Sequence, residues 1–233
     1  MLHKLLCAVF VSTLLVSNFK LRAEDEAAAK ARMAFDKTFR DTFKVDEQNL
    51  SSSGKNAYFI LEPGYQLVLE GKADGKDTRL TVSVLNETKK IGNVETRVVE
   101  EKEVLIENGK VTENSRNYFA IDKTNGDLYY FGEDVGGAWT SGVDGARFGL
   151  FLPGAPKLGD KFYNEVAKLA MDRSEIVSVS DTVKTPAGTF KDCVKMEETT
   201  PLEPKTKEYK IFAPGIGLVQ DGDLVLVKYS TGK

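Results

Sequence analysis

Three carboxylates beside aromatic rings are the residues of this sequence best suited to chemistry. Glu133 and Asp134 follow the aromatic run Tyr129–Phe131 after a single glycine, and Asp144 lies five residues after Trp139. Aromatic rings stack on sugar faces, and two carboxylates about 5–9.5 Å apart can serve as acid and base or as nucleophile. The pattern predicts a glycan hydrolase or lyase. The alternative is that the rings belong to the core and the acids are solvated in a glycine-rich loop.

The near absence of histidine limits which other reactions are open to the protein. The only histidine is His3, which lies in the first twenty-odd residues. Without another one, Ser-His-Asp triads, Cys-His pairs and His-ligated zinc are excluded. We expect Cys193 to be packed in the core, and we expect no cofactor and no metal. The acidic run Asp122–Asp127 has glycine at its fifth position, where a helical calcium loop needs it at the sixth, so a hairpin turn explains it better.

The N-terminus has the pattern of an export signal. A short basic start precedes an apolar run, Leu5–Phe19, and Ala23 stands just before an acidic segment. This predicts a signal peptide cleaved near Ala23 and a periplasmic or extracellular location, with an uncleaved anchor as the alternative. The run is shorter than the roughly 20 residues that span a bilayer, so no transmembrane segment is expected in the mature chain. Removing residues 1–23, with three bases and no acid, changes the net charge from −3 to −6. That charge argues against nucleic acid as a partner.

The segment after the signal predicts a helix over residues 24–44. Alanines favour it, and Ala31, Phe35, Phe39 and Phe43 recur every four residues as one apolar stripe. We expect this stripe to pack on a sheet, although a membrane or partner helix would have a similar pattern. A linker at Ser51–Gly54 follows. The predicted organisation is a signal peptide (1–23), a helix with its linker (24–55) and an antiparallel β domain (56–233).

Beyond residue 55 the apolar period changes to two, which indicates strands with one wet face. Asp74-Gly75, Asn108-Gly109 and Asn125-Gly126 separate such runs and are typical of tight hairpin turns. The fold class is therefore mainly β (α+β), a single curved antiparallel sheet or half-barrel with an N-terminal helix. The charged stretch Glu95–Glu103 is interpreted as the wet face of a strand. Residues 132–159 hold eight of the 20 glycines and show no clear period.

Residues 127–219 resemble exported bacterial proteins that are mostly uncharacterised. The resemblance is carried by Tyr130-Phe131-Gly132-Glu133, by Trp139 with Gly142–Ala146, by Pro156–Asp160, by Pro186–Phe190 with Cys193, and by Ala213–Val219. It implies an envelope protein with a curved antiparallel sheet and carries no activity for any residue. A looser, fold-level likeness is to lipoprotein carriers, half-open barrels with a helix across the mouth.

The leading functional hypothesis is a non-enzymatic envelope protein that binds an apolar or amphiphilic small molecule or lipid. The concave face of an incomplete barrel offers a pocket that a helix or loop can cover. The residues expected to line it are aromatic: Phe35, Phe39, Phe43, Tyr130, Trp139 and Phe148. The alternatives are the histidine-free glycan hydrolase or lyase that uses Glu133, Asp134 or Asp144, and a structural module that interacts through an exposed sheet edge.

Overall fold

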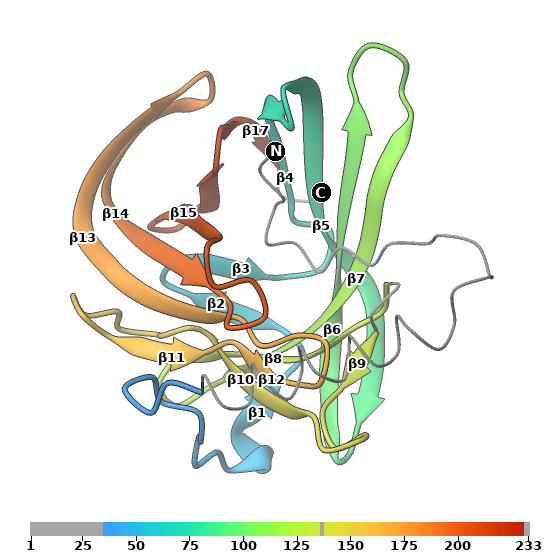
Figure 1. The fold of residues 1–233 in the computed structure, drawn as a ribbon, viewed down its shortest axis with the longest axis vertical. Coiled ribbons are helices and arrows are strands. Elements are labelled where there is room, and N and C mark those ends of the chain that lie inside the picture. Colours follow the sequence, from blue (N-terminus) through green and yellow to red (C-terminus); the bar gives the residue numbers. More distant parts are fainter. Residues whose placement is uncertain (1–34, 136–137, 231–233) are drawn as a thin grey trace.

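The protein is built on one antiparallel sheet of 15 strands, which curls until its two ends nearly meet (Figure 1). This computed structural model describes residues 35–135 and 138–230. A separate two-stranded ribbon, β2–β3, lies beside the sheet. Besides the strands, the described residues contain one short 3₁₀ helix, η1 (Glu47–Asn49). The strands are β1 (Leu50–Ser51), β2 (Gly54–Asn56), β3 (Phe59–Leu61), β4 (Gln66–Ala73), β5 (Lys76–Ile91), β6 (Val94–Leu105), β7 (Val111–Asp122), β8 (Leu128–Glu133), β9 (Trp139–Thr140), β10 (Arg147–Leu152), β11 (Lys161–Tyr163), β12 (Glu165–Val166), β13 (Arg173–Thr185), β14 (Gly188–Thr199), β15 (Lys207–Ala213), β16 (Gly217–Asp221) and β17 (Leu224–Ser230).

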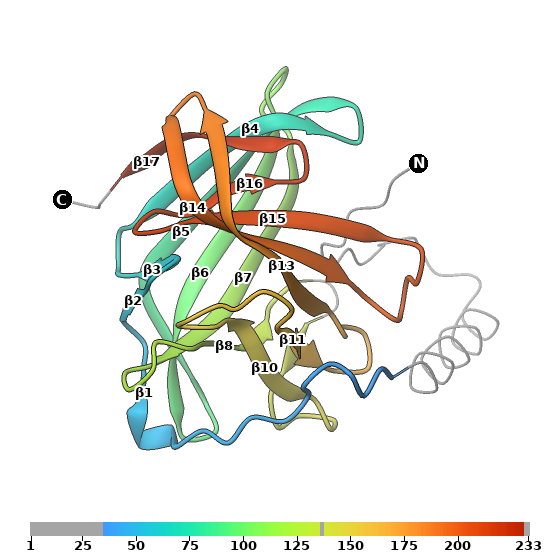
Figure 2. The ribbon, with the colours of Figure 1, turned by 90° about the vertical axis from the view of Figure 1, so that its left-hand side faces the viewer.

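The strands follow one another around the sheet as two meanders. The first runs from β4 through β8 to β10, and the second runs from β13 to β17. Strand β17 pairs with β4 and joins the two meanders. Figure 2 shows the resulting curved wall, with β13 and β14 crossing in front of β5 to β7. The prediction of a single curved antiparallel sheet is confirmed, and the sheet is nearly a barrel.

The predicted hairpin turns are present where Asn-Gly and Asp-Gly occur. Asp74 and Gly75, with φ of 50° and 76°, connect β4 to β5. Gly109 and Gly126, with φ of 69° and 77°, lie between β6 and β7 and between β7 and β8. Left-handed backbone is accessible to glycine and tolerated by Asp and Asn, so these dipeptides turn the chain without strain.

The two ends of the sheet meet in a single stretch of chain, residues 161–166, which we call the closing segment. Its first half, β11, pairs with β13, and its second half, β12, pairs with β10. Only Asn164 separates the two halves. A Cβ on Gly149 of β10 would lie 2.2 Å from the carbonyl oxygen of Tyr163, so only glycine lets β10 come this close.

The predicted helix over residues 24–44 is wrong for its described part, residues 35–44. The remainder, residues 24–34, lies outside the described residues. Residues 35–43, which we call the strap, form a turn and then an extended stretch. The carboxylate of Asp36 accepts hydrogen bonds from the backbone N–H and the hydroxyl of Thr38, at 2.9 and 2.7 Å. Such a local side-chain bond stabilises a turn in place of a helix.

Backbone hydrogen bonds between Arg40 and the closing segment hold the strap in its extended form instead of a helix. Arg40 donates its N–H to the carbonyl of Lys161 at 3.0 Å, and its carbonyl accepts from the N–H of Tyr163 at 2.9 Å. The phenylalanines still pack, but as parts of an extended segment. Phe35 stacks on Tyr163 with ring centroids 4.7 Å apart, and Phe39 meets the same ring edge-on at 6.0 Å.

The glycine-rich region 132–159 contains two strands where the sequence showed no period. Strand β9 pairs with β8, and β10 pairs with both β8 and β12. Strand β9 has two residues, and the middle of β10 is buried on both faces, so neither produces an alternating pattern. A Cβ on Gly132 would lie 2.7 Å from the carbonyl oxygen of Trp139, which explains a glycine where β9 approaches β8.

Candidate functional site: the cavity inside the barrel

The barrel encloses a cavity of about 80 Å³ that is partly open to solvent. Inward-facing side chains from nearly every strand around the ring line it. One part of the lining is apolar and largely aromatic, and another part is charged. The lining residues are Phe59, Leu67, Val82, Glu101, Asn117, Phe119, Tyr130, Glu133, Phe151, Asn164, Glu165, Asp172, Glu198, Lys210, Phe212, Leu218 and Asp221.

The apolar wall is a chain of aromatic rings in edge-on and stacked contact. Phe119 lies 4.9 Å from Tyr130 and 5.0 Å from Phe151, measured between ring centroids. Phe59 meets Phe119 at 5.7 Å, and Phe212 meets Phe151 at 6.3 Å. Rings packed in this way hold each other in place, so this wall is a rigid apolar surface.

The polar wall holds six carboxylates and one basic residue, Lys210. Alternation along the strands places them there. On β14, Val194, Met196 and Glu198 are all buried, and the residues between them are partly exposed. In a strand, alternate residues share a face, so Glu198 continues an inward apolar series.

Glu133 reaches the cavity because β8 contains a bulge. Phe119 is paired with Tyr130, but the preceding residue, Tyr118, is paired with Gly132. Phe131 is therefore the extra residue on β8. A bulge shifts all later side chains to the opposite face. Glu133 consequently faces the cavity together with Tyr130, although the two residues are three positions apart.

An ion pair crosses the polar wall from β14 to β15. The ammonium of Lys210 donates to both carboxylate oxygens of Glu198, at 3.0 Å each. Burial opposes the charged lysine, but Glu198 and Asp221 outweigh this and raise the pKa of Lys210 well above its ordinary value.

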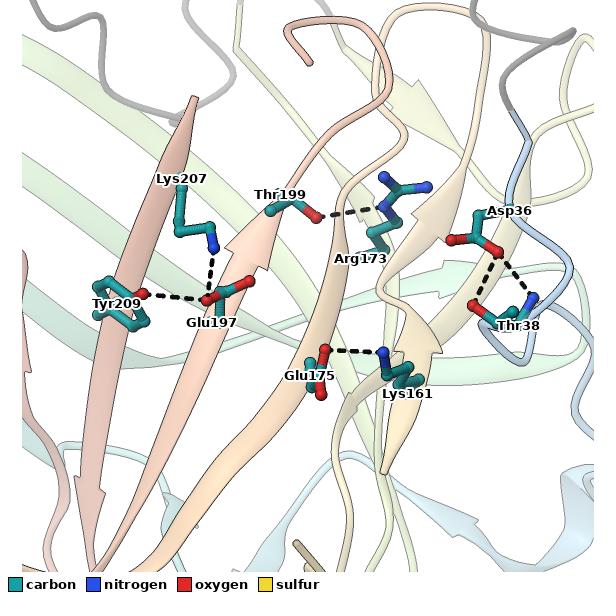
Figure 3. Close-up of polar contacts among 9 residues, drawn as sticks. All are labelled: Asp36, Thr38, Lys161, Arg173, Glu175, Glu197, Thr199, Lys207 and Tyr209. Atoms are coloured by element: carbon teal, nitrogen blue, oxygen red, sulfur yellow. Dashed lines mark hydrogen bonds and ion pairs between the residues drawn. The ribbon is translucent and has the colours of Figure 1, made fainter. Parts of the chain in front are cut away.

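The outer face of the same strands has a different character. There, Lys207 pairs with Glu197, and the Tyr209 hydroxyl donates to the same carboxylate at 3.0 Å, beside the Lys161–Glu175 pair (Figure 3). These outer charges are partly exposed to solvent, whereas the side chains of Lys210 and Glu198 retain 15% and 5% exposure. Strands β14 and β15 thus share a solvent-screened ion pair on their outer face and a buried ion pair on their inner face.

Glu165 and Asp172 form a second polar cluster at the closing segment. The backbone N–H of Asp172 donates to Oε1 of Glu165 at 2.6 Å. Burial, followed by the charge of Asp172, raises the pKa of Glu165 well above its ordinary value. Burial, followed by the charge of Glu198, raises the pKa of Asp172 to about 8. Near neutral pH Asp172 is therefore largely protonated.

Glu101 on β6 titrates near neutrality. Burial raises its pKa to about 7, and the nearby charge of Lys210 limits the rise. The side chain retains some accessible surface, which we attribute to contact with the cavity, because the residue is among those lining it. The polar wall thus changes charge within the physiological range of pH.

Two asparagines fix the geometry between the polar and apolar walls. The Tyr130 hydroxyl donates to Oδ1 of Asn117 at 2.6 Å. The Asn164 side chain donates to the carbonyl of Leu150 at 3.2 Å and accepts from the hydroxyl of Ser174 at 2.8 Å. Asn164 therefore bridges β10 and β13, the strands on either side of the closing segment.

The aromatic residues predicted to line a pocket lie in several places. Tyr130 lines the cavity, and Trp139 packs edge-on against it with ring centroids 5.1 Å apart. Phe148 is stacked on Phe131 at 4.7 Å, away from the lining. Phe43 packs on Tyr129, and Phe35 and Phe39 pack on Tyr163.

The predicted catalytic carboxylates do not share one site. Glu133 faces the cavity, whereas Asp134, its neighbour on the chain, accepts a hydrogen bond from the Tyr118 hydroxyl at 3.2 Å. Asp144 lies in a turn with φ of 50° and lines a different, surface groove of about 380 Å³. This groove also holds the Asp41–Arg147 ion pair.

Apart from Glu133, the carboxylates of the cavity were missed by the sequence analysis. The stretch Glu95–Glu103 was interpreted as a wet face, but Glu103 and Arg97 are buried and Glu101 lines the cavity. Around Glu101 the residues on both faces of β6 are charged. Apolar and polar residues therefore do not alternate there, and the sequence does not show which of the charged residues face the cavity. On β14 a signal did exist, since Glu198 follows Val194 and Met196 at spacing two.

Within the described residues, no group of three or more His, Cys, Asp and Glu side chains is arranged to hold a metal ion. No helix in residues 35–135 and 138–230 is long and apolar enough to cross a membrane.

Comparison with known proteins places the chain in no family. No family matches the sequence, and no curated protein matches it. A similar solved structure is a "putative lipoprotein" from Parabacteroides distasonis ATCC 8503, with 16% identity and a TM-score of 0.43. The match covers 76% of this chain and 100% of the other. The resemblance of residues 127–219 to exported bacterial proteins stays a prediction from the sequence.

Proposed function

We propose that this protein is an exported, non-enzymatic binding protein that holds an amphiphilic molecule inside its barrel. The observation that carries the proposal is the division of the cavity into an aromatic wall and a carboxylate wall. Ligand sites are typically apolar with a few convergent polar groups. A molecule with an apolar part and a polar head would meet matching surfaces on both sides.

The polar wall also suggests the chemistry of the head group. Six carboxylates face the cavity, and the single lysine among the lining residues is already bonded to Glu198. A head group that donates hydrogen bonds or carries positive charge would be favoured, and an anionic head group would be repelled. The ligand class is therefore an amphiphile with an amine-like head.

Competition between two amphiphiles of equal length tests this proposal. The protein is loaded with the neutral dye N-phenyl-1-naphthylamine, and decylamine or decanoate is then added. We expect decylamine to displace the dye at a concentration at least tenfold below that of decanoate. Trp139, the only tryptophan, packs against Tyr130 of the cavity wall and provides a second readout through its fluorescence. Failure of the dye to bind, or equal competition, would overturn the proposal.

A cavity-filling variant locates the site. Val82 lines the cavity, and Val82→Phe should weaken dye binding at least tenfold because the larger side chain occupies the space. Thr81→Phe, one residue earlier on β5 and absent from the lining residues, is the matched control and should bind as the unmodified protein does.

Export is part of the same proposal and is supported by the basic, apolar and small-residue pattern of residues 1–23. We expect the secreted form to begin at Glu24. Intact-mass measurement on protein from the periplasm or the medium checks this, and a mass that retains residues 1–23 would contradict it.

Histidine-free glycan hydrolysis is a second candidate, and one observation favours it. Burial raises the pKa of Glu101 to about 7, a suitable value for a general acid, within the cavity that Glu133 also lines. If the protein cleaves glycans, Glu101→Gln and Glu133→Gln should each reduce the rate by at least 100-fold. Full activity in both variants would rule out this use of the cavity.

A further inference from the structure

The cavity is small for the ligand proposed above. Its volume of about 80 Å³ accommodates a head group or a few water molecules, whereas pockets for small molecules usually measure about 300–1,000 Å³. A ligand with an apolar tail therefore requires the barrel to widen or open. Such opening breaks the fewest backbone hydrogen bonds at the strand junction with the fewest residue pairs.

Among the neighbouring strands of the ring that no tight turn connects, β10 and β12 share the fewest residue pairs. It consists of two residue pairs, Arg147↔Val166 and Phe148↔Glu165. The junction between β17 and β4, which joins the two meanders of the ring, has five pairs. Opening at β12 would leave most of the closing segment in place, because β11 stays paired with β13 and the strap holds Lys161 and Tyr163 through Arg40.

Strand β12 also carries the carboxylate that is least compatible with charge. The side chain of Glu165 lines the cavity and is 1% exposed, and its hydrogen bond from the Asp172 backbone draws the two acids together. These two adjacent carboxylates cannot both ionise without mutual repulsion and, at the fully buried Glu165, without a desolvation cost.

The charges that face this pair come from the surrounding strands. Glu133 (β8), Glu198 (β14) and Lys210 (β15) act on it, and Glu101 and Asp221 line the same cavity from β6 and β16. Outside, Arg147 is paired with Asp41, and Arg173 lies over the ring of Phe39 at 4.8 Å. Among the residues that line the cavity, Lys210 is the only base, and it is bonded to Glu198.

We propose that β12 is the gate of the cavity, and that ionisation of Glu165 and Asp172 releases it from β10. In the protonated form both acids are tolerated and the gate is closed. In the ionised form their mutual repulsion is relieved when β12 moves outward and water reaches the carboxylates. The role of the gate in ligand entry rests on the proposed function, but its opening does not.

The direction of the pKa shifts agrees with this geometry. Burial raises the pKa of Asp172 to about 8, so this acid loses its proton as the pH rises past neutrality, and burial also raises the pKa of Glu165 above its ordinary value. The gate should therefore be closed at pH 6 and open more often at pH 9.

Amide hydrogen exchange on the ligand-free protein tests the gate, with rates corrected for their intrinsic pH dependence. We expect protection in residues 147–150 and 165–172 to fall at least tenfold between pH 6 and pH 9, relative to the β5–β6 hairpin. Global unfolding would affect both regions equally. Unchanged relative protection in the unmodified protein would overturn the proposal without the need for any variant.

Variants identify the acids responsible. In Glu165→Gln with Asp172→Asn, the relative protection should not depend on pH, and the single Asp172→Asn serves if the double variant does not fold. Glu175→Gln is the matched control, because Glu175 lies on the same hairpin but pairs on the outside with Lys161. A fall that persists in the acid variants would exclude these residues. Because no ligand is present, failure of dye binding would contradict the proposed function alone.

Discussion

Lys210 and Glu198 form a two-point ion pair inside the barrel, with both nitrogen–oxygen distances at 3.0 Å. The pair is surrounded by five further carboxylates that line the same cavity. The Lys210 ammonium is therefore the only positive charge among the residues that line this cavity. Removing the lysine should affect both the stability and the protonation of this wall.

Lys210→Met should destabilise the fold by about 3–5 kcal/mol, because it leaves Glu198 buried without its counter-charge. Adding Glu198→Gln should recover a large part of that loss. Lys207→Met is the matched control, since it breaks a solvent-exposed outer pair between the same strands and should leave the stability almost unchanged. Urea unfolding measures all three. Equal losses for the inner and outer variants would contradict the buried pair.

Stability should decrease as the pH rises from about 4 to about 8. Glu101, Glu165 and Asp172 have folded-state pKa values above their ordinary values of 4.5 and 3.8, so the folded state binds more protons than the unfolded state in this window. Their contribution is fully present below about pH 4 and is lost as the pH passes the raised values. We expect the free energy of unfolding to fall by at least about 2 kcal/mol between pH 5 and pH 8.

The same measurement on Asp172→Asn should give a flatter curve, since one of the titrating groups has been removed. Asp160→Asn, which removes a partly exposed acid just before β11, should leave the slope unchanged. A stability that is constant or rises between pH 5 and pH 8 in the unmodified protein would show that these acids are not held neutral in the fold.

Asn164 and Ser174 should be energetically coupled. Asn164→Ala leaves the Leu150 carbonyl and the Ser174 hydroxyl without this partner, at a cost of about 2–3 kcal/mol. Ser174→Ala should cost about 1 kcal/mol, and the double variant should cost less than the sum. A double-mutant cycle by chemical unfolding checks this. Strict additivity would mean that Asn164 does not join the two strands.

Gly149→Ala should destabilise the protein by at least about 2 kcal/mol, because the added methyl group meets the backbone of Tyr163 and Asn164. Gly109→Asn is the control: nothing lies near its Cβ, and asparagine tolerates its φ of 69°. Thermal unfolding distinguishes them. A stable Gly149→Ala protein would mean that β10 can move away from the closing segment at little cost.

The antiparallel sheet could be predicted because its signals are local. Alternation in Leu80, Val82 and Val84 marks a strand, and Asn125-Gly126 marks a turn, whatever the rest of the chain does. The helix prediction failed because the stripe of Phe35, Phe39 and Phe43 fits an extended segment equally well once Tyr163 and Tyr129 offer rings to pack on. Periodicity of apolar residues does not identify their partners.

By itself the sequence determined most of the strands and of their turns, the antiparallel sheet and the absence of histidine chemistry beyond residue 3. Only the tertiary structure decided which charged residues face inward. Glu101 stands between charged neighbours on both sides, Glu133 is turned by a bulge, and Glu165 reaches the cavity only because the closing segment joins two distant strands. Closure of the barrel is a long-range event. It brings carboxylates from separate strands around one small volume, where burial rather than sequence proximity sets their pKa values.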